Sequence, residues 1–306
     1  MTGAPRAFRK IGWQRLRLDV PESLRLATID RNYLLFGEVS GRPALELKWA
    51  QAATKAQADP FYYLTKLSGS QRKGFEKLDV SPWTLPDAWQ GVLSFFAVSG
   101  FSWRADGQEG KGLILCCPVC GTVTVIRFFP VSFLNTPDLI PQILASFVDH
   151  PDKEHILWAV FDIEAVLPAS FALQFHRFDV GRFELRFSHG PHHLTLYRWA
   201  MAHVLLKGNP LENWPQNFGF PSQAQERRGQ SGKGEYVEWM SSGRKSLLGL
   251  AGEYRLLRLM HIAHKDRVIG MELAIRYRWR KSPPGAFLAN TPEDAMNTLW
   301  NGYGLV

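Results

Sequence analysis

WQRLRLDVPESLRL, residues 13–26, has a counterpart in WAVFDIEAVLPASFAL, residues 158–173. Both stretches begin with tryptophan, continue with alternating apolar residues, and reach a Pro-x-Ser-apolar-x-Leu pattern. Two further pairs follow in the same order: PALELKWAQA (43–52) with HHLTLYRWAMA (192–202), and NTPDLIPQIL (135–144) with NTPEDAMNTL (290–299). Ordered matches at a nearly constant offset predict an internal duplication. The alternative is that unrelated strands simply resemble one another.

The two copies predict the same elements in the same order. Apolar residues alternate with period two in most segments, which is typical of half-buried strands. Helices are expected near 50–67 and 200–208, and a closing helix at each Asn-Thr-Pro, with Thr136 and Thr291 as N-caps. The expected fold is α+β: two pseudo-twofold-related repeats, 1–150 and 151–306, each an antiparallel sheet packed with helices. The polar, Gly-rich stretch near 219–235 is expected to be a flexible loop.

Composition limits the class of protein. The chain has 306 residues, of which 45% are hydrophobic and 21% charged, as in globular proteins. It has neither a run of about 18 apolar residues nor a signal-peptide core, so we expect no membrane span and a cytoplasmic location. All three cysteines fall within five positions, which cannot give a disulfide framework. The net charge of +8 fits either a polyanionic partner or a merely soluble basic surface.

The cysteines lie in LILCCPVCGTVTVI, residues 113–126, where Cys117 and Cys120 flank a turn between two apolar runs. Under the duplication, this turn corresponds to LMHIAHKDRVIGMEL, which holds His261 and His264 at the same spacing. Two thiolates and two imidazoles form a common tetrahedral zinc set, so we expect one zinc ion shared by the two copies. With four protein ligands the site is closed to substrate, and the zinc would be structural.

Two alternatives to the metal site remain open: a turn of unmetallated thiols, and a redox pair of cysteines. A redox Cys-x-x-Cys usually begins a helix beside a thioredoxin-like unit, and we find no such unit. Cys116 is expected to be a buried apolar cysteine. His150 and His155 lie with Asp149, Asp152 and Glu154 at the junction of the copies, where we interpret them as linker polarity.

The chain contains no nucleophile elbow, phosphate-binding loop, dinucleotide fingerprint or His-Glu-x-x-His signature, so no specific reaction is predicted. RYRWRK places Arg276, Arg278 and Arg280 on one face of an expected strand. Such a row can neutralise phosphates, and this makes a nucleic acid or another polyanion a candidate partner. The alternative is a solvated edge strand whose charges oppose aggregation.

Finally, the opening Trp, strand and Pro-x-Ser-apolar-x-Leu, followed by strands that end in Lys/Arg-Trp, resembles the PsbP-like superfamily of small α/β sandwich domains. The likeness covers about the first 40 residues of each copy. It implies a non-enzymatic accessory or binding protein. We therefore expect a zinc-stabilised binding or assembly factor with a protein partner. The alternatives are a nucleic-acid-binding accessory protein and an enzyme whose site lies between the copies.

Overall fold

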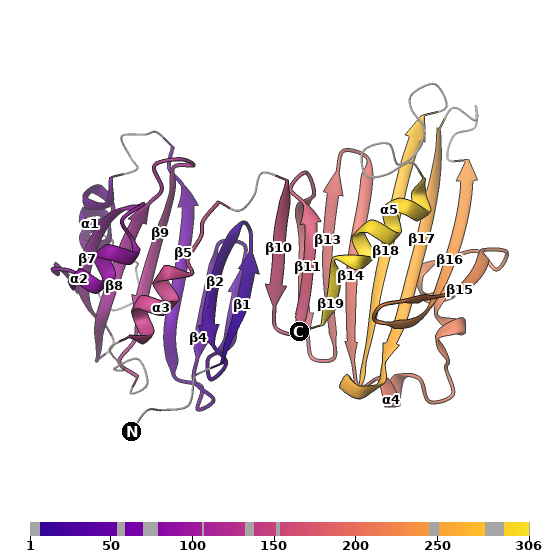
Figure 1. Ribbon diagram of the computed structural model, residues 1–306, viewed down its shortest axis with the longest axis horizontal. Coiled ribbons are helices and arrows are strands. Elements are labelled where there is room, and N and C mark those ends of the chain that lie inside the picture. Colours follow the sequence, from indigo (N-terminus) through magenta and orange to yellow (C-terminus); the bar gives the residue numbers. More distant parts are fainter. Residues whose placement is uncertain are drawn as a thin grey trace. The chain divides into compact units, whose positions relative to one another are not determined.

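The computed structural model describes residues 7–53, 59–69, 79–105, 107–131, 138–150, 154–244, 251–278 and 291–305. The chain divides into two compact units (Figure 1). The first consists of Met1–Asp152 and Leu157–Phe161, and the second of Lys153–Ile156 and Asp162–Val306. Each unit is built around a seven-stranded antiparallel sheet.

The sheet of the first unit has the order β3-β4-β5-β9-β8-β7-β6. Its strands are β3 (Arg25–Asp30), β4 (Tyr33–Gly37), β5 (Pro43–Gln51), β6 (Asp79–Pro82), β7 (Ala97–Ala105), β8 (Gln108–Cys116) and β9 (Thr122–Phe128). Outside this sheet, β1 (Phe8–Trp13) pairs with β2 (Leu16–Pro21), and its Gly12 pairs with Ala159 of β10 (His155–Val160). The helices are α1 (Pro60–Gly69), α2 (Asp87–Val92) and α3 (Leu139–Ala145).

The sheet of the second unit has the order β12-β13-β14-β18-β17-β16-β15. Its strands are β12 (Ala172–Asp179), β13 (Arg182–His189), β14 (His192–Ala200), β15 (Gln225–Ser231), β16 (Gly234–Arg244), β17 (Ala251–Ile262) and β18 (Arg267–Arg278). Beside it, β11 (Ile163–Pro168) pairs with β19 (Tyr303–Leu305). The helical segments are α4 (Ala202–Leu205), η3 (Leu211–Phe218), η4 (Ala263–Lys265) and α5 (Pro292–Asn301).

The two large sheets share one strand order. In each, three consecutive strands are followed by a helical connection to the far edge, and four further strands return until the last pairs with the third. A helix then follows the last strand of the sheet, α3 in the first unit and α5 in the second. In Figure 1, α5 crosses β17 and β18, against which it packs. This common order is what an internal duplication predicts.

The predicted fold class is wrong. The described part of the chain is mostly β, with large antiparallel sheets, and its helices are short, so it is not an α+β fold of sheets packed against helices. The physical reason is clearest in the connection that follows β14. The stretch expected to be helical at 200–208 forms only the short α4, because β14 continues to Ala200 and Gly208 adopts a positive φ of 73°.

Edge strands account for another difference between prediction and structure. The segment near 219–235, which was expected to be a flexible loop, contains β15 and the start of β16. Residues of β15 are mostly exposed, so its sequence QERRGQS has no apolar face to reveal a strand. At the end of the second unit the predicted N-cap is confirmed, because Thr291 accepts a hydrogen bond from Asp294 N at the start of α5. The other predicted N-cap, Thr136, lies outside the described residues.

Each sheet covers a hydrophobic core. In the first unit a cluster of buried side chains includes Phe101, Trp103 and Cys116, as expected for that cysteine. In the second unit a cluster built on Tyr197 and Trp199 extends to the connection between β14 and β15. Within the described ranges, no helix combines the length and the apolar character that crossing a membrane would require.

Candidate metal centre

The cysteine turn joins β8 to β9. Cys117 N donates to Thr122 O at 2.9 Å, and Gly121 N donates to Cys117 O at 3.0 Å. Gly121 has a φ of 71°, in the left-handed region that glycine adopts without a steric penalty. This tight turn places Cys120 N 3.5 Å from Cys117 Sγ. Two thiols three residues apart therefore face the same space.

The other half of the site follows α3. Val148 exchanges two backbone hydrogen bonds with Arg17 of β2, each 2.8 Å long. This bridge ties the chain beyond the helix to a strand, and thereby fixes the next two residues, Asp149 and His150. Both side chains reach the cysteine turn, although Asp149 lies 29 residues along the chain from Cys120.

The four side chains form one cluster. Cys117 Sγ lies 3.4 Å from His150 Nδ1, and Cys120 Sγ lies 3.4 Å from Asp149 Oδ2. Asp149 Oδ1 is 2.6 Å from His150 Nδ1. The potential ligand atoms of all four residues lie within 4.8 Å of one another. Beside the cluster, Thr122 Oγ1 lies 3.1 Å from Cys120 Sγ.

Two of the four potential ligands, Cys117 and Asp149, are buried. Only 2% of the Asp149 side chain is exposed, and Cys117 is buried as well. Burial raises the pKa of the Cys117 thiol to about 12. Among the described residues, the ion pair of Asp149 is with His150 and not with a lysine or arginine. Burial alone disfavours the charged forms of these groups. A bound cation would favour them, since it stabilises both a buried carboxylate and a thiolate.

Two of the distances are close to those around a tetrahedral ion. Zinc bonds of about 2.3 Å to sulfur and about 2.0–2.2 Å to nitrogen or oxygen separate neighbouring ligand atoms by roughly 3.4–3.8 Å. The sulfur–nitrogen and sulfur–oxygen distances of 3.4 Å lie at the lower limit of this range. The hydrogen-bonded Asp149–His150 pair is closer, and Asp149 also offers Oδ2, the atom that faces Cys120. The cluster could therefore hold a metal ion through four protein ligands.

The same residues do not form a catalytic Cys-His-Asp triad. In a triad, the nucleophile and the acid contact different nitrogens of the imidazole ring. Here Cys117 and Asp149 both contact Nδ1 of His150. The thiol is also buried, with a raised pKa, whereas a reactive cysteine needs access and a lowered pKa. These points also weigh against the redox alternative.

Two of the predicted ligands, Cys117 and Cys120, belong to this cluster. The other two, His261 and His264, belong to the second unit, where His261 lies on β17, one residue before its end, and His264 lies in η4. The turn that carries them joins β17 to β18, the counterparts of β8 and β9 in the common strand order. That they share an ion with the cysteines stays a prediction. The cluster offers four potential ligands without them.

In the sequence, Asp149 and His150 have the pattern of a polar linker, which does not predict them as potential ligands. The available sequence signal for these two residues was their position shortly after a helix that follows the cysteine hairpin. Nothing in the sequence indicates the bridge between Arg17 and Val148 that brings them to the turn, because it joins residues far apart in the chain.

The predicted arginine row is only partly described. Arg276 lies on β18 and its Nε donates to Glu253 Oε1 at 2.8 Å, so a buried carboxylate partly neutralises it. Arg278 ends β18, and Arg280 lies outside the described residues. Nucleic-acid binding by this row stays a prediction.

Comparisons with known proteins add no assignment to this geometry. No known protein family matches the chain. No curated protein matches it either.

Proposed function

We propose that the protein is a non-catalytic, zinc-stabilised binding or assembly protein, with its structural zinc on Cys117, Cys120, Asp149 and His150. The observation that carries this proposal is the convergence of four ligand groups, two of them buried, within 4.8 Å. Thiolate and imidazole ligands favour zinc over magnesium or calcium. The resemblance to PsbP-like domains supports the accessory role, and the geometry around His150 supports a site without catalysis.

The ion would join the β8–β9 hairpin to the segment that follows α3. Its role is mechanical: it ties two segments that are distant in sequence and neutralises the buried Asp149 carboxylate. Metal binding to the folded state stabilises it by about 4 kcal/mol when free zinc exceeds the dissociation constant a thousandfold. Backbone N–H donation from Cys120 to Cys117 Sγ and the contact of Thr122 with Cys120 would orient the sulfurs.

Metal analysis of the purified full-length chain tests the proposal. We expect one zinc per chain and a lower melting midpoint after treatment with a chelator. Cys120→Ser and His150→Gln should lose the metal, because each removes a ligand. His261→Gln and His264→Gln are the matched controls, and they should retain it.

The same variants distinguish this ligand set from a zinc ion shared between the two copies. Loss of zinc from His264→Gln together with full retention by His150→Gln would support the ion shared between the copies and contradict this ligand set. A protein that neither contains metal nor melts at a higher temperature when zinc is added would contradict a metal centre altogether.

A further inference from the structure

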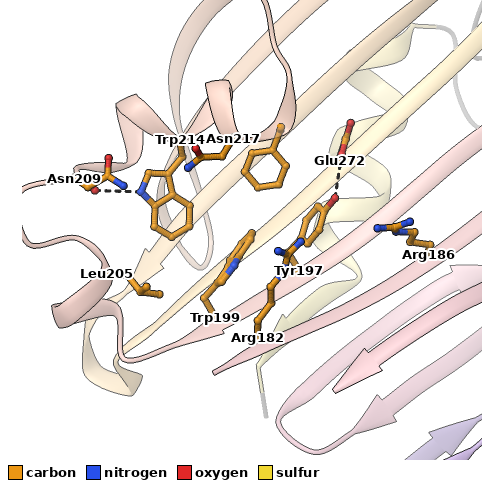
Figure 2. Close-up of a pocket in the computed structure, with 10 residues that line it drawn as sticks. Arg182, Arg186, Tyr197, Trp199, Leu205, Asn209, Trp214, Asn217 and Glu272 are labelled. Atoms are coloured by element: carbon orange, nitrogen blue, oxygen red, sulfur yellow. Dashed lines mark hydrogen bonds between the residues drawn. The ribbon is translucent and has the colours of Figure 1, made fainter. Parts of the chain in front are cut away.

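A cavity of about 520 Å³ opens on the second unit, between the sheet and the connection from β14 to β15 (Figure 2). Its size lies within the usual range for small-molecule sites. The sheet side carries Tyr197 and Trp199 of β14, whose rings are nearly parallel, with centroids 5.2 Å apart. The connection contributes Trp214 and Phe218. The Trp214 ring packs edge-on against Trp199, and the Phe218 ring packs edge-on against Tyr197, with the ring centroids 5.2 Å apart in each pair.

Strand register places two arginines beside these aromatic side chains. Arg182 pairs across the sheet with Trp199, and Glu184 pairs with Tyr197. Arg186 lies two residues further along the same face of β13. Glu184 is 1% exposed and accepts hydrogen bonds from Arg182 Nη2, at 3.0 Å, and from Arg186 Nε. One buried carboxylate therefore orients both guanidinium groups.

The charges around the cavity leave it cationic. Glu272 accepts from Arg255 through Oε1, and from the Tyr197 hydroxyl through Oε2 at 3.1 Å. Three arginines, at 182, 186 and 255, thus face two carboxylates, at 184 and 272, which gives a net charge of +1. Each guanidinium carries five N–H donors. Arg182 Nε is buried and has no hydrogen-bond partner among the residues that the structure describes.

Amides supply polarity on the opposite side. Asn209 and Asn217 line the cavity from the connecting segment, and the Trp214 indole donates to Asn209 O at 3.1 Å, which holds this wall in place. Figure 2 shows Asn209 and Trp214 across the cavity from Trp199 and Arg182. The cavity is thus lined by aromatic side chains, two arginines and two amides.

We propose that this cavity binds a small planar anion: an aromatic or conjugated ring that carries a carboxylate, sulfonate or phosphate. The ring packs against the aromatic side chains that line the cavity, and the anionic group receives hydrogen bonds from Arg182 and Arg186. Guanidinium groups suit such anions because their planar donors match two oxygens at once. The site uses no residue of the metal centre, so it holds whether or not zinc is bound.

A matched pair of fluorescent probes tests this assignment in the full-length protein. The first, 1-anilinonaphthalene-8-sulfonate, has the ring system and the anion. The second, N-phenyl-1-naphthylamine, has the same rings without the sulfonate. We expect saturable one-to-one binding of the sulfonate, detected by energy transfer from tryptophan, and binding of the neutral probe that is at least tenfold weaker.

Arginine variants locate the probe. Arg182→Gln and Arg186→Gln should each weaken sulfonate binding by roughly tenfold, as expected for a lost charge-assisted hydrogen bond. Arg177→Gln is the control, because this exposed arginine of β12 pairs with Asp179 and does not line the cavity. Near-ultraviolet circular dichroism checks that each variant is folded.

Three results would overturn the proposal: no saturable binding of the sulfonate, equal affinity for the neutral probe, or unchanged affinity in both cavity variants. Because zinc content is measured independently, failure here leaves the proposed metal centre untouched.

Discussion

Lys233 shows how a single residue can stabilise the end of a helix. Its Nζ donates to Trp300 O at 2.8 Å, to Asn301 O at 3.0 Å and to Tyr303 O. The carbonyls at a helix C-terminus have no partner within the helix and attract cations. Burial lowers the pKa of this lysine, while Glu164 opposes the shift. One side chain thus ties the turn between β15 and β16 to the end of α5.

Lys233→Met should therefore destabilise the second unit. The substitution keeps most of the apolar stem and removes all three N–H donors, so three carbonyls, two of them in partly buried contacts, each lose a hydrogen bond. We expect the free energy of unfolding in urea to fall by about 1–3 kcal/mol. The exposed Lys207, changed to Met, serves as the control. Equal losses from the two variants would show that the hydrogen bonds to α5 contribute little.

At this scale, local spacing was predictable and long-range neighbours were not. The positions of Cys117 and Cys120 indicated a turn with both thiols together, and the burial of Cys116 followed from strand alternation. Asp149 reaches them only through a backbone bridge between segments far apart in sequence. Lys233 fell within a stretch expected to be a loop. No sequence pattern predicts the contacts of Asp149 or of Lys233.

Paired strands of the first sheet depend on glycines that face aromatic rings. Phe101 of β7 pairs with Gly112 of β8, and Trp103 pairs with Gly110. A Cβ atom at Gly112 would lie 2.2 Å from Phe101 Cζ, well inside the contact distance of two carbon atoms. The glycine thus gives the ring the space to lie flat across the neighbouring strand.

Gly112→Ala should accordingly destabilise the first unit, because the ring of Phe101 must move within a packed core. We expect a loss of about 1–3 kcal/mol, typical of overpacking, measured by thermal or urea unfolding. Gly91→Ala in α2 is the control, since a Cβ there meets open space and alanine favours a helix by up to about 1 kcal/mol. A variant at Gly112 as stable as the wild type would show that the sheet adjusts freely.

Elements with one buried face were predictable from the sequence, whereas edge elements were not. The alternation in residues 44–49 and 182–187 predicted strands that the structure confirms as parts of β5 and β13. The edge strand β6 has largely exposed residues, and β12 likewise, so their patterns resemble loops. Missing these strands while expecting longer helices produced the incorrect α+β class.

At the scale of the whole molecule, the two units share a strand order but not a metal cluster. Within the described residues, the one group of potential ligands is that of the first unit, around Cys117. The corresponding turn between β17 and β18 carries His261 and His264. A duplication explains the common order, and it stays a prediction. Stabilisation by zinc should then be a property of the first unit.

Hydrogen exchange with and without a chelator tests this difference between the units. Removing an ion that binds only the folded cluster lowers the cost of local opening around it. We expect amides of β8, β9 and α3 to exchange faster after chelation, whereas those of β17 and β18 keep their rates. His150→Gln should reproduce the effect without a chelator, and His264→Gln should not. Equal acceleration in both hairpins would contradict a centre confined to the first unit, since it would mean that loss of the ion loosens both halves of the chain.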